Sequence, residues 1–172
     1  MSERKQNKKI DKRAPVIVGV GDLVDRSKED GLNPQELLAK ACEHAIQDSG
    51  IKELNKHIDY IGVVRFTVDF LTATNQSNFQ YSNFPRTLAN KLNVSAKNEV
   101  YAPMGGNSPQ VLLEDALVKI STGESDCALL SGGEALQTMI AKLKAGMSLD
   151  WLDEPGGSPE MIGNNDIGFS DH

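Results

Sequence analysis

The chain has 172 residues, of which 39% are hydrophobic and 24% are charged, and this composition fits one globular domain with its own core. The formal net charge of −6 argues against nucleic acid as the main partner, and no run approaches the roughly 18 apolar residues of a membrane span. Cys42 and Cys127 are far in sequence from one another and from the three histidines, so the sequence indicates no metal site. Two lone thiols are typical of proteins in a reducing compartment, which predicts a cytoplasmic location.

The two ends of the chain differ in charge from the part between them. Residues 1–13 are rich in Lys and Arg, and we expect them to form a flexible basic tail. Residues 147–172 form an acidic segment rich in Gly, Asn and Pro, which we expect to be an extended loop without a partner element that leads into further sequence. The domain proper is expected to span residues 14–146.

The first elements in chain order are a strand, a helix and a second strand. The β-branched run PVIVGVG at residues 15–21 predicts a buried strand. A helix follows, because Asn33 can cap it, Pro34 suits its first position and Glu36 completes a capping box. Gly50 is placed to end this helix, and residues 58–66 predict the next strand.

The remaining elements continue the alternation. A short helix is expected within residues 81–92, a strand at 98–103, a helix at 109–122, a strand within 126–135 and a last helix before Gly146. Asn107 or Ser108 can cap the helix at 109–122, and Gly123 can end it. Strands that alternate with helices predict an α/β fold with a largely parallel sheet.

The sequence GGNSPQ at residues 105–110 stands where a strand meets a helix. A helix N-terminus exposes unpaired N–H groups and a partial positive charge, so it can bind an anion or favour a thiolate. The corner is equally explained by a capped helix after a glycine turn, and both interpretations stay open. Glu134, at the end of a predicted strand, can border a pocket or simply begin a helix.

Several stretches in the same order resemble one known family. Three stretches resemble parts of the N-terminal half of proteins of the thiolase family, in its sterol-carrier-type acetyl-CoA acetyltransferase branch. They are PQELLAKACEHAIQDSG, YSNFPRTLANKL and GGNSPQVLLEDALVKISTGESDCALLSGGEAL. The resemblance covers residues 14–136. It implies a thiolase-like α/β fold, in which an N-terminal βαβαβαββ half has a mixed, mainly parallel sheet and a central buried helix.

The resemblance also implies a function, an acyl-CoA acyltransferase of the acetyl-CoA C-acetyltransferase type. Such enzymes carry a nucleophilic cysteine at the N-terminus of the central helix. Here that position falls on Gly105 when the sequences are aligned on Gln110, or on Gly106 when they are aligned on Gly123, so we assign no catalytic residue. Asn107 and Ser108 are the expected substrate-binding residues.

The partners follow from the same resemblance. Acyl-CoA is expected as substrate, with no separate cofactor and no metal, and the complete protein is expected to be a homodimer. The acid/base groups of the second half have no counterpart here, so this chain alone is expected to be inactive. The alternative is a non-catalytic acyl-CoA-binding or scaffold protein of the same fold. A third possibility is an unrelated nucleotide-binding module at residues 19–22, although Val24 replaces the last glycine of the dinucleotide fingerprint.

If the chain is half of a paired architecture, the apolar surface that faces the other half is exposed. We therefore expect the isolated chain to associate in solution. Light scattering coupled to size-exclusion chromatography measures this directly, and a monodisperse monomer at all concentrations contradicts the half-protein interpretation.

Overall fold

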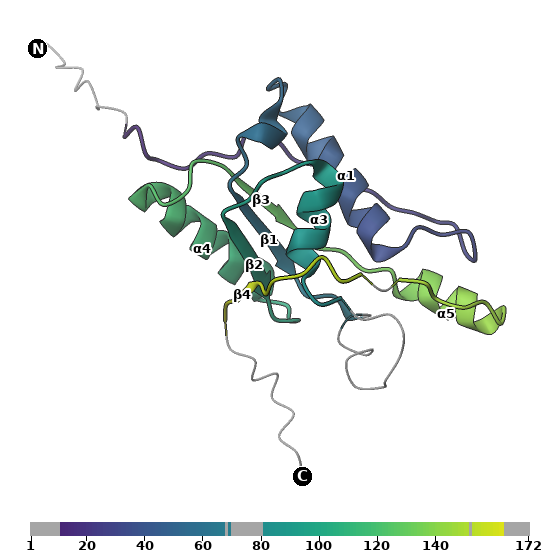
Figure 1. Cartoon of the computed structure of the whole chain (residues 1–172). Coiled ribbons are helices and arrows are strands. Elements are labelled where there is room, and N and C mark those ends of the chain that lie inside the picture. The colour runs from purple at the N-terminus through teal and green to yellow at the C-terminus, as the bar shows by residue number, and fades with distance from the viewer. Residues whose placement is uncertain (1–10, 68, 70–80, 152, 164–172) are drawn as a thin grey trace, which may run out of the picture.

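The computed structural model of the chain describes residues 11–67, 69, 81–151 and 153–163 (Figure 1). Its centre is a four-stranded sheet in the order β3-β1-β2-β4, and every pair of neighbouring strands is parallel. The strands are β1 (Tyr60–Val64), β2 (Asn98–Ala102), β3 (Ala128–Ser131) and β4 (Glu160–Met161). The predicted α/β class with a mainly parallel sheet is confirmed.

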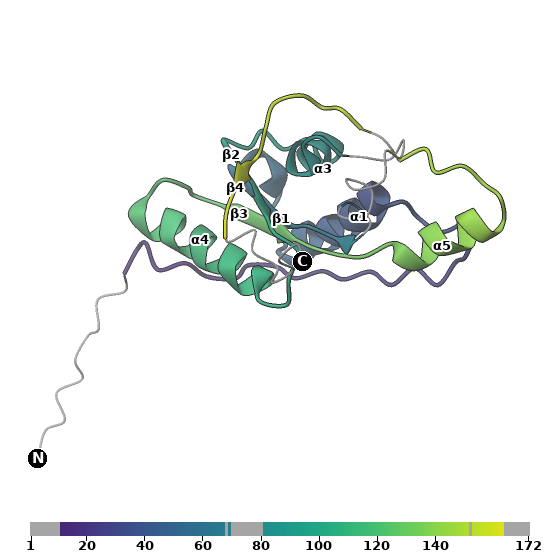
Figure 2. The same ribbon diagram turned by 90° about the horizontal axis from the view of Figure 1, so that it is seen from below.

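Helices cover both faces of this sheet. They are α1 (Pro34–Asp48), α3 (Phe84–Leu92), α4 (Ser108–Thr122) and α5 (Leu136–Lys144), with a 3-10 turn at Leu54–Lys56. Figure 2 shows α1 and α3 separated from α4 by the strands, while α5 extends beyond them. None of the described helices is both long and apolar enough to cross a membrane.

Side chains that alternate along the strands divide the core in two. Ile61, Val63 and Tyr101 belong to the larger cluster, with α1 and α3. Tyr60, Val100 and their neighbours pack with Leu112 and Ala116 of α4 in the smaller cluster. Helix α4 is therefore buried along one stripe, while its Leu117 and Val118 are 38% and 52% exposed.

The sequence signals at the helix ends are confirmed in detail. Asn33 and Glu36 form the full capping box at the start of α1, and Gly50 follows that helix with φ of +65°. Gly123 ends α4 with φ of +82°. Asn83 caps α3 through the Arg86 N–H at 3.2 Å, so this helix begins at Phe84, as expected within residues 81–92.

The predicted strand at residues 15–21 is wrong. The segment is extended but pairs with no described strand, and Val16 and Ile17 are 76% and 78% exposed. Its two glycines instead lie against α1, where a Cβ on Gly19 or Gly21 would overlap the helix backbone. Contact with a helix accounts for these glycines, and no phosphate-binding turn forms there.

The acidic C-terminal segment is also more structured than expected. Residues 160–161 form β4 and pair with β2, and the Ser82 N–H donates to the Asp153 carbonyl at 3.4 Å. Arg86 bridges Glu99 at 2.8 Å and donates to the Gly156 carbonyl at 3.3 Å, which holds the returning chain against α3. The expected loop thus has partners in its described part. The end of the segment, 164–172, and most of the basic tail, 1–10, lie outside the described residues.

One residue, Asp59, joins the amino ends of three strands. Asp59, just before β1, accepts the Ser125 hydroxyl at 2.5 Å and the Cys127 N–H at 3.2 Å, both ahead of β3. Its carbonyl accepts the N–H groups of Lys97 and Asn98 at the start of β2. Burial alone would raise the pKa of the Asp59 carboxyl, but these hydrogen bonds outweigh it and lower the pKa below the ordinary 3.8.

We expect Asp59→Asn to lower the free energy of unfolding at pH 7 by about 1–3 kcal/mol, because the amide replaces a charged acceptor. Because the folded pKa is depressed, this contribution is present above the unfolded pKa and is lost as pH falls through the folded value. The variant should therefore lose less stability than wild type on acidification below pH 3.8.

Urea unfolding at pH 7 and at decreasing pH measures both effects. The exposed Asp150→Asn is the matched control and should behave like wild type. Equal acid sensitivity of wild type and Asp59→Asn would show that the Asp59 carboxylate does not tie the strands.

Candidate functional site

The corner at residues 105–110 lies at the carboxyl edge of the sheet. It follows β2, which ends at Ala102, and leads directly into α4. Because all the described strand pairs are parallel, the carboxyl ends of β1 and β3 lie at the same edge. Open α/β sheets bind ligands at this edge.

The entrance to α4 differs from the expected capped helix. Asn107 occupies the N-cap position but has φ of −92° and ψ of −11°, and its side chain makes no capping hydrogen bond. A capping side chain needs an extended backbone, and this helical conformation points it elsewhere. Ser108 is already the first helical residue, so the predicted cap role of both residues is wrong.

The two candidate substrate-binding side chains face different environments. Asn107 is exposed, and its amide is available to solvent at the helix entrance. Ser108 is 2% exposed, and its hydroxyl lies close to Gly105. The structure thus brings the two residues together, with one side chain turned out and the other turned in.

The two glycines at the expected nucleophile position are not equivalent. An added Cβ on Gly105 would lie 3.2 Å from the Ser108 hydroxyl oxygen and 3.3 Å from the Asn107 amide oxygen. An added Cβ on Gly106 would have nothing within 4 Å. Neither glycine has positive φ. Gly106 therefore leaves open space where a side chain would fit without strain.

Both thiols of the chain lie away from this entrance. Cys127 precedes β3 at the amino edge of the sheet and is half-buried. Cys42 lies within α1 and is buried. Burial raises the pKa of both thiols, and the charges of Asp59 and Asp126 raise that of Cys127 further. Neither thiol is a thiolate nucleophile at neutral pH.

A buried polar cluster at the carboxyl edge was missed by the sequence analysis. The Tyr101 hydroxyl donates to the Asp69 carboxylate at 2.9 Å, and Arg65 lies 3.0 Å from the same oxygen. The Arg65 guanidinium also lies 4.9 Å from the centre of the Tyr101 ring. Burial, together with the Asp69 charge, raises the pKa of Tyr101 well above its usual value, so the phenol stays protonated.

This cluster is on the opposite face of the sheet from α4. Tyr101 packs in the core shared with α1 and α3, whereas Ala102 packs with α4. The cluster therefore fixes the loop after β1 and does not face the entrance at Gly106. No single residue signalled it, because Tyr101 meets Asp69 and Arg65, which stand four residues apart, only through strand register.

Glu134 connects the segment after β1 with the segment after β3 at the carboxyl edge of the sheet. Its carboxylate accepts the Thr67 N–H at 2.8 Å and the Ala135 N–H at 3.0 Å. It also borders a cavity of about 230 Å³ next to Leu23, Leu37 and Thr138. Both interpretations offered from the sequence thus apply, a pocket border and a carboxylate near a helix start.

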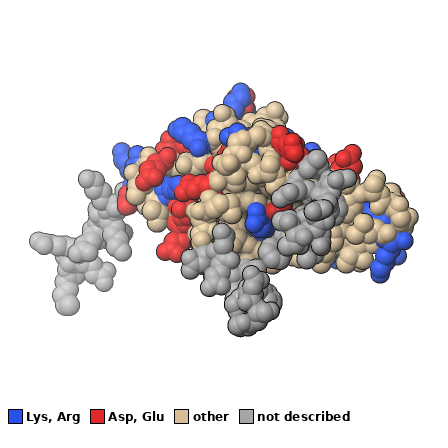
Figure 3. All heavy atoms as spheres, turned by 60° about the horizontal axis from the view of Figure 1, so that its bottom comes forward, with Lys and Arg blue, Asp and Glu red and all other residues tan. Residues whose placement is uncertain are grey.

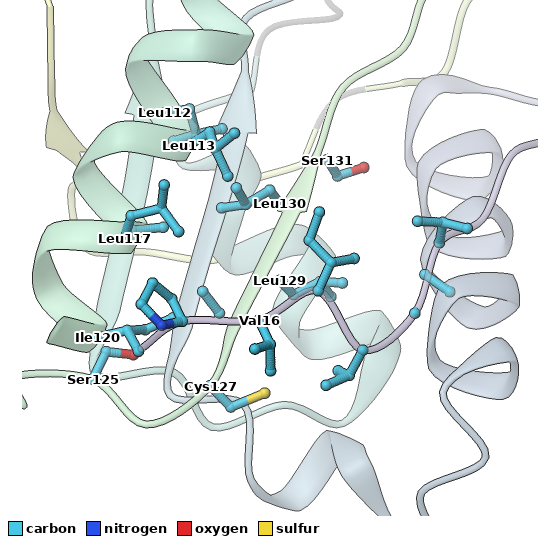
Figure 4. Close-up of a pocket in the computed structure, with 18 of the residues that line it drawn as sticks. Val16, Leu112, Leu113, Leu117, Ile120, Ser125, Cys127, Leu129, Leu130 and Ser131 are labelled. Atoms are coloured by element: carbon cyan, nitrogen blue, oxygen red, sulfur yellow. The ribbon is translucent and has the colours of Figure 1, made fainter. Parts of the chain in front are cut away.

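A larger cavity of about 1360 Å³ lies along the flank of α4 (Figure 4). Its lining is mostly apolar, with Leu112, Leu113 and Leu117 from α4 and residues 125–133 around β3. The lining reaches Pro109 but includes none of the residues from Gly105 to Ser108. The cavity is therefore separate from the helix entrance.

On the face of the molecule shown in Figure 3, the charged side chains do not mark out a further binding surface. Acidic and basic side chains are interspersed there, and the described atoms on that face show no continuous basic patch.

Comparison with known proteins identifies the fold. Neither protein-family profiles nor curated proteins match the sequence. Among solved structures, the chain is similar to the crystal structure of a monomeric SCP2-thiolase-like protein type 1 from Mycobacterium smegmatis, with a TM-score of 0.55 and 30% sequence identity. The match covers 73% of this chain and 24% of the other, so this chain spans about a quarter of that protein's length. The chain has an SCP2-thiolase-like α/β fold, which confirms the predicted fold.

The space for an added Cβ differs between Gly105 and Gly106, and alanine substitutions at the two positions test this difference through protein stability. Gly106→Ala should raise the free energy of unfolding by about 0.4–1 kcal/mol, because it restricts the unfolded chain without a clash. Gly105→Ala should gain less or lose stability, since the Ser108 hydroxyl must move. Chemical denaturation compares the two variants, and a Gly106→Ala that destabilises more than Gly105→Ala would contradict the described corner.

Proposed function

We propose that the N-terminus of α4 binds the acyl group of an acyl-CoA thioester, in a complete protein of the sterol-carrier-type thiolase branch. In this proposal the chain contributes binding and orientation but no nucleophile. The observation that carries it is the open helix entrance at Gly106, at the carboxyl edge of a thiolase-like sheet.

Helix physics supports binding at this point. The partial positive charge of a helix N-terminus attracts a carbonyl oxygen or a developing oxyanion. The exposed Asn107 amide adds a hydrogen-bond donor beside it. The missing side chains of Gly105 and Gly106 let a ligand approach the backbone closely.

The same geometry argues against acyl transfer by this chain. An acyl-enzyme needs a thiolate or an activated hydroxyl to attack the thioester carbonyl and expel the CoA thiolate. Cys42 and Cys127 lie elsewhere with raised pKa values, and Ser108 is buried with no described base hydrogen-bonded to its hydroxyl. Claisen-type chemistry would require groups from outside this chain.

Binding is tested by calorimetric titration with acetoacetyl-CoA. Asn107→Ala should weaken binding roughly three- to tenfold, the equivalent of one lost hydrogen bond. The exposed Gln110→Ala, one helical turn further on, is the matched control and should bind like wild type. Absence of binding to wild type, or equal affinities for all three proteins, would overturn the proposal.

The missing nucleophile can be restored at the open position. Gly106→Cys should form an acyl adduct with acetyl-CoA, because a thiol at a helix N-terminus has a lowered pKa. Lys144→Cys places an exposed thiol at the C-terminus of α5, where the helix charge opposes ionisation, and should form much less adduct.

Intact-mass spectrometry measures both reactions. Wild type should show no adduct, which would separate binding from catalysis. An adduct on wild type would show that the chain has its own nucleophile, and equal labelling of the two variants would show that the entrance does not activate a thiol.

A further inference from the structure

The described chain between residues 153 and 163, here called the returning segment, passes around the outer edge of β2. Near its start, the Gly156 carbonyl accepts hydrogen bonds from the side chains of Asn83 and Arg86, both at 3.3 Å, beside α3. Further on, the segment pairs with β2 as β4, which lies next to β2 in Figure 1. The returning segment therefore leads from α3 to the strand that ends at the candidate site.

Beyond this pairing, the returning segment lies against the first turns of α4. Ile162 packs on the smaller core cluster, which includes Leu112 of α4. An added Cβ on Gly163 would lie 3.2 Å from Pro103 and 3.7 Å from Val111, so the backbone of the segment is close to both side chains. Pro103 precedes the corner at 105–110 in sequence, and Val111 follows it.

The start of α4 lacks the local contact that usually fixes a helix entrance. Asn107 makes no side-chain capping bond, although its carbonyl accepts the Val111 N–H at 3.1 Å. A helix end without a cap leaves its first N–H groups without side-chain partners. The contact of Gly163 with Val111, one turn into the helix, is thus a tertiary contact at a point where the sequence supplies no cap.

The returning segment is held by few and mostly exposed interactions. None of its described residues is buried, and the Ile162 N–H donates to the Tyr101 carbonyl at 3.4 Å, a long hydrogen bond. Lys119 of α4 pairs with Glu160 at 2.9 Å, and the Glu160 side chain is 51% exposed. Segments with few buried contacts and exposed hydrogen bonds open locally at a lower free energy than the core.

We propose that docking of the returning segment on α4 regulates ligand binding at the α4 entrance. This inference rests on the proposed binding of an acyl-CoA thioester at that entrance. The docked segment fixes the first turn of α4 and the corner before it, so the ligand meets an ordered entrance. When the segment opens, part of the binding free energy is used to order the entrance again. By linkage, a ligand that prefers the docked state also favours docking.

Amide hydrogen exchange on the full chain, followed by NMR, tests this linkage. The Ile162 amide reports docking, because its N–H bonds to β2. Saturating acetoacetyl-CoA should slow its exchange roughly fivefold or more. The Gly50 amide, which bonds to the Gln47 carbonyl at the end of α1, is the control and should exchange at an unchanged rate.

Two glycine variants test the same linkage from the side of the protein. Gly163→Ala forces a side chain into a position with φ of +77° and crowds Pro103, so it should open the segment. We expect faster exchange at Ile162 and roughly fivefold or greater loss of affinity for acetoacetyl-CoA in calorimetric titration. Gly146→Ala is the matched control, because its φ is +69° but nothing lies within 4 Å of the added Cβ, and it should bind like wild type.

The two proposals can fail separately. A wild type that binds acetoacetyl-CoA without slower exchange at Ile162 overturns the regulation and leaves the binding proposal in place. Equal affinities of Gly163→Ala and Gly146→Ala have the same meaning. A wild type that does not bind acetoacetyl-CoA at all overturns both proposals.

Discussion

The amino ends of three parallel strands are joined through Asp59, and the position of the helix entrance depends on this tie. Its carboxylate holds the residues before β3, and its carbonyl holds the start of β2. In a parallel sheet, a register fixed at one edge also fixes where the strands end at the other. The level at which β2 turns into α4 is therefore set by the backbone carbonyl of Asp59, at the opposite edge of the sheet from the site.

The candidate site combines a helix entrance at the carboxyl edge of the sheet with glycines in place of reactive side chains. A helix N-terminus at the carboxyl edge of a parallel sheet is an arrangement suited to anionic or carbonyl ligands. The chain has glycine at the position where the resemblance led us to expect a nucleophile, and burial raises the pKa of both of its thiols, which lie elsewhere. The similarity to an SCP2-thiolase-like protein supports the fold, and the acyl-CoA ligand is our proposal for the chemistry that such an entrance can serve.

The sequence predicted those features that depend on neighbours along the chain. Asn33 and Glu36 act within three residues of each other at the start of α1, and Gly50 lies next to its other end, so the bounds of α1 could be predicted. The strand at 15–21 failed because β-branched residues indicate a half-buried extended chain but not its partner, and the two glycines there respond to α1, far along the sequence. The site was only partly predictable for the same reason. The corner at 105–110 is local, whereas Tyr101 meets Asp69 and Arg65 only after the sheet has formed.

The exposed edge of β3 matters for encounters between molecules as well as for the fold. A strand edge without charges or proline can be extended by a strand from another chain, which is a route to aggregation. β3 has the sequence ALLS and carries neither protective feature. Residues 12–21 line the opposite side of the cavity next to this edge, so they restrict the space in which a strand from another molecule could pair. The tendency of the protein to aggregate therefore depends on the residues that precede α1, although this segment contributes little to the core.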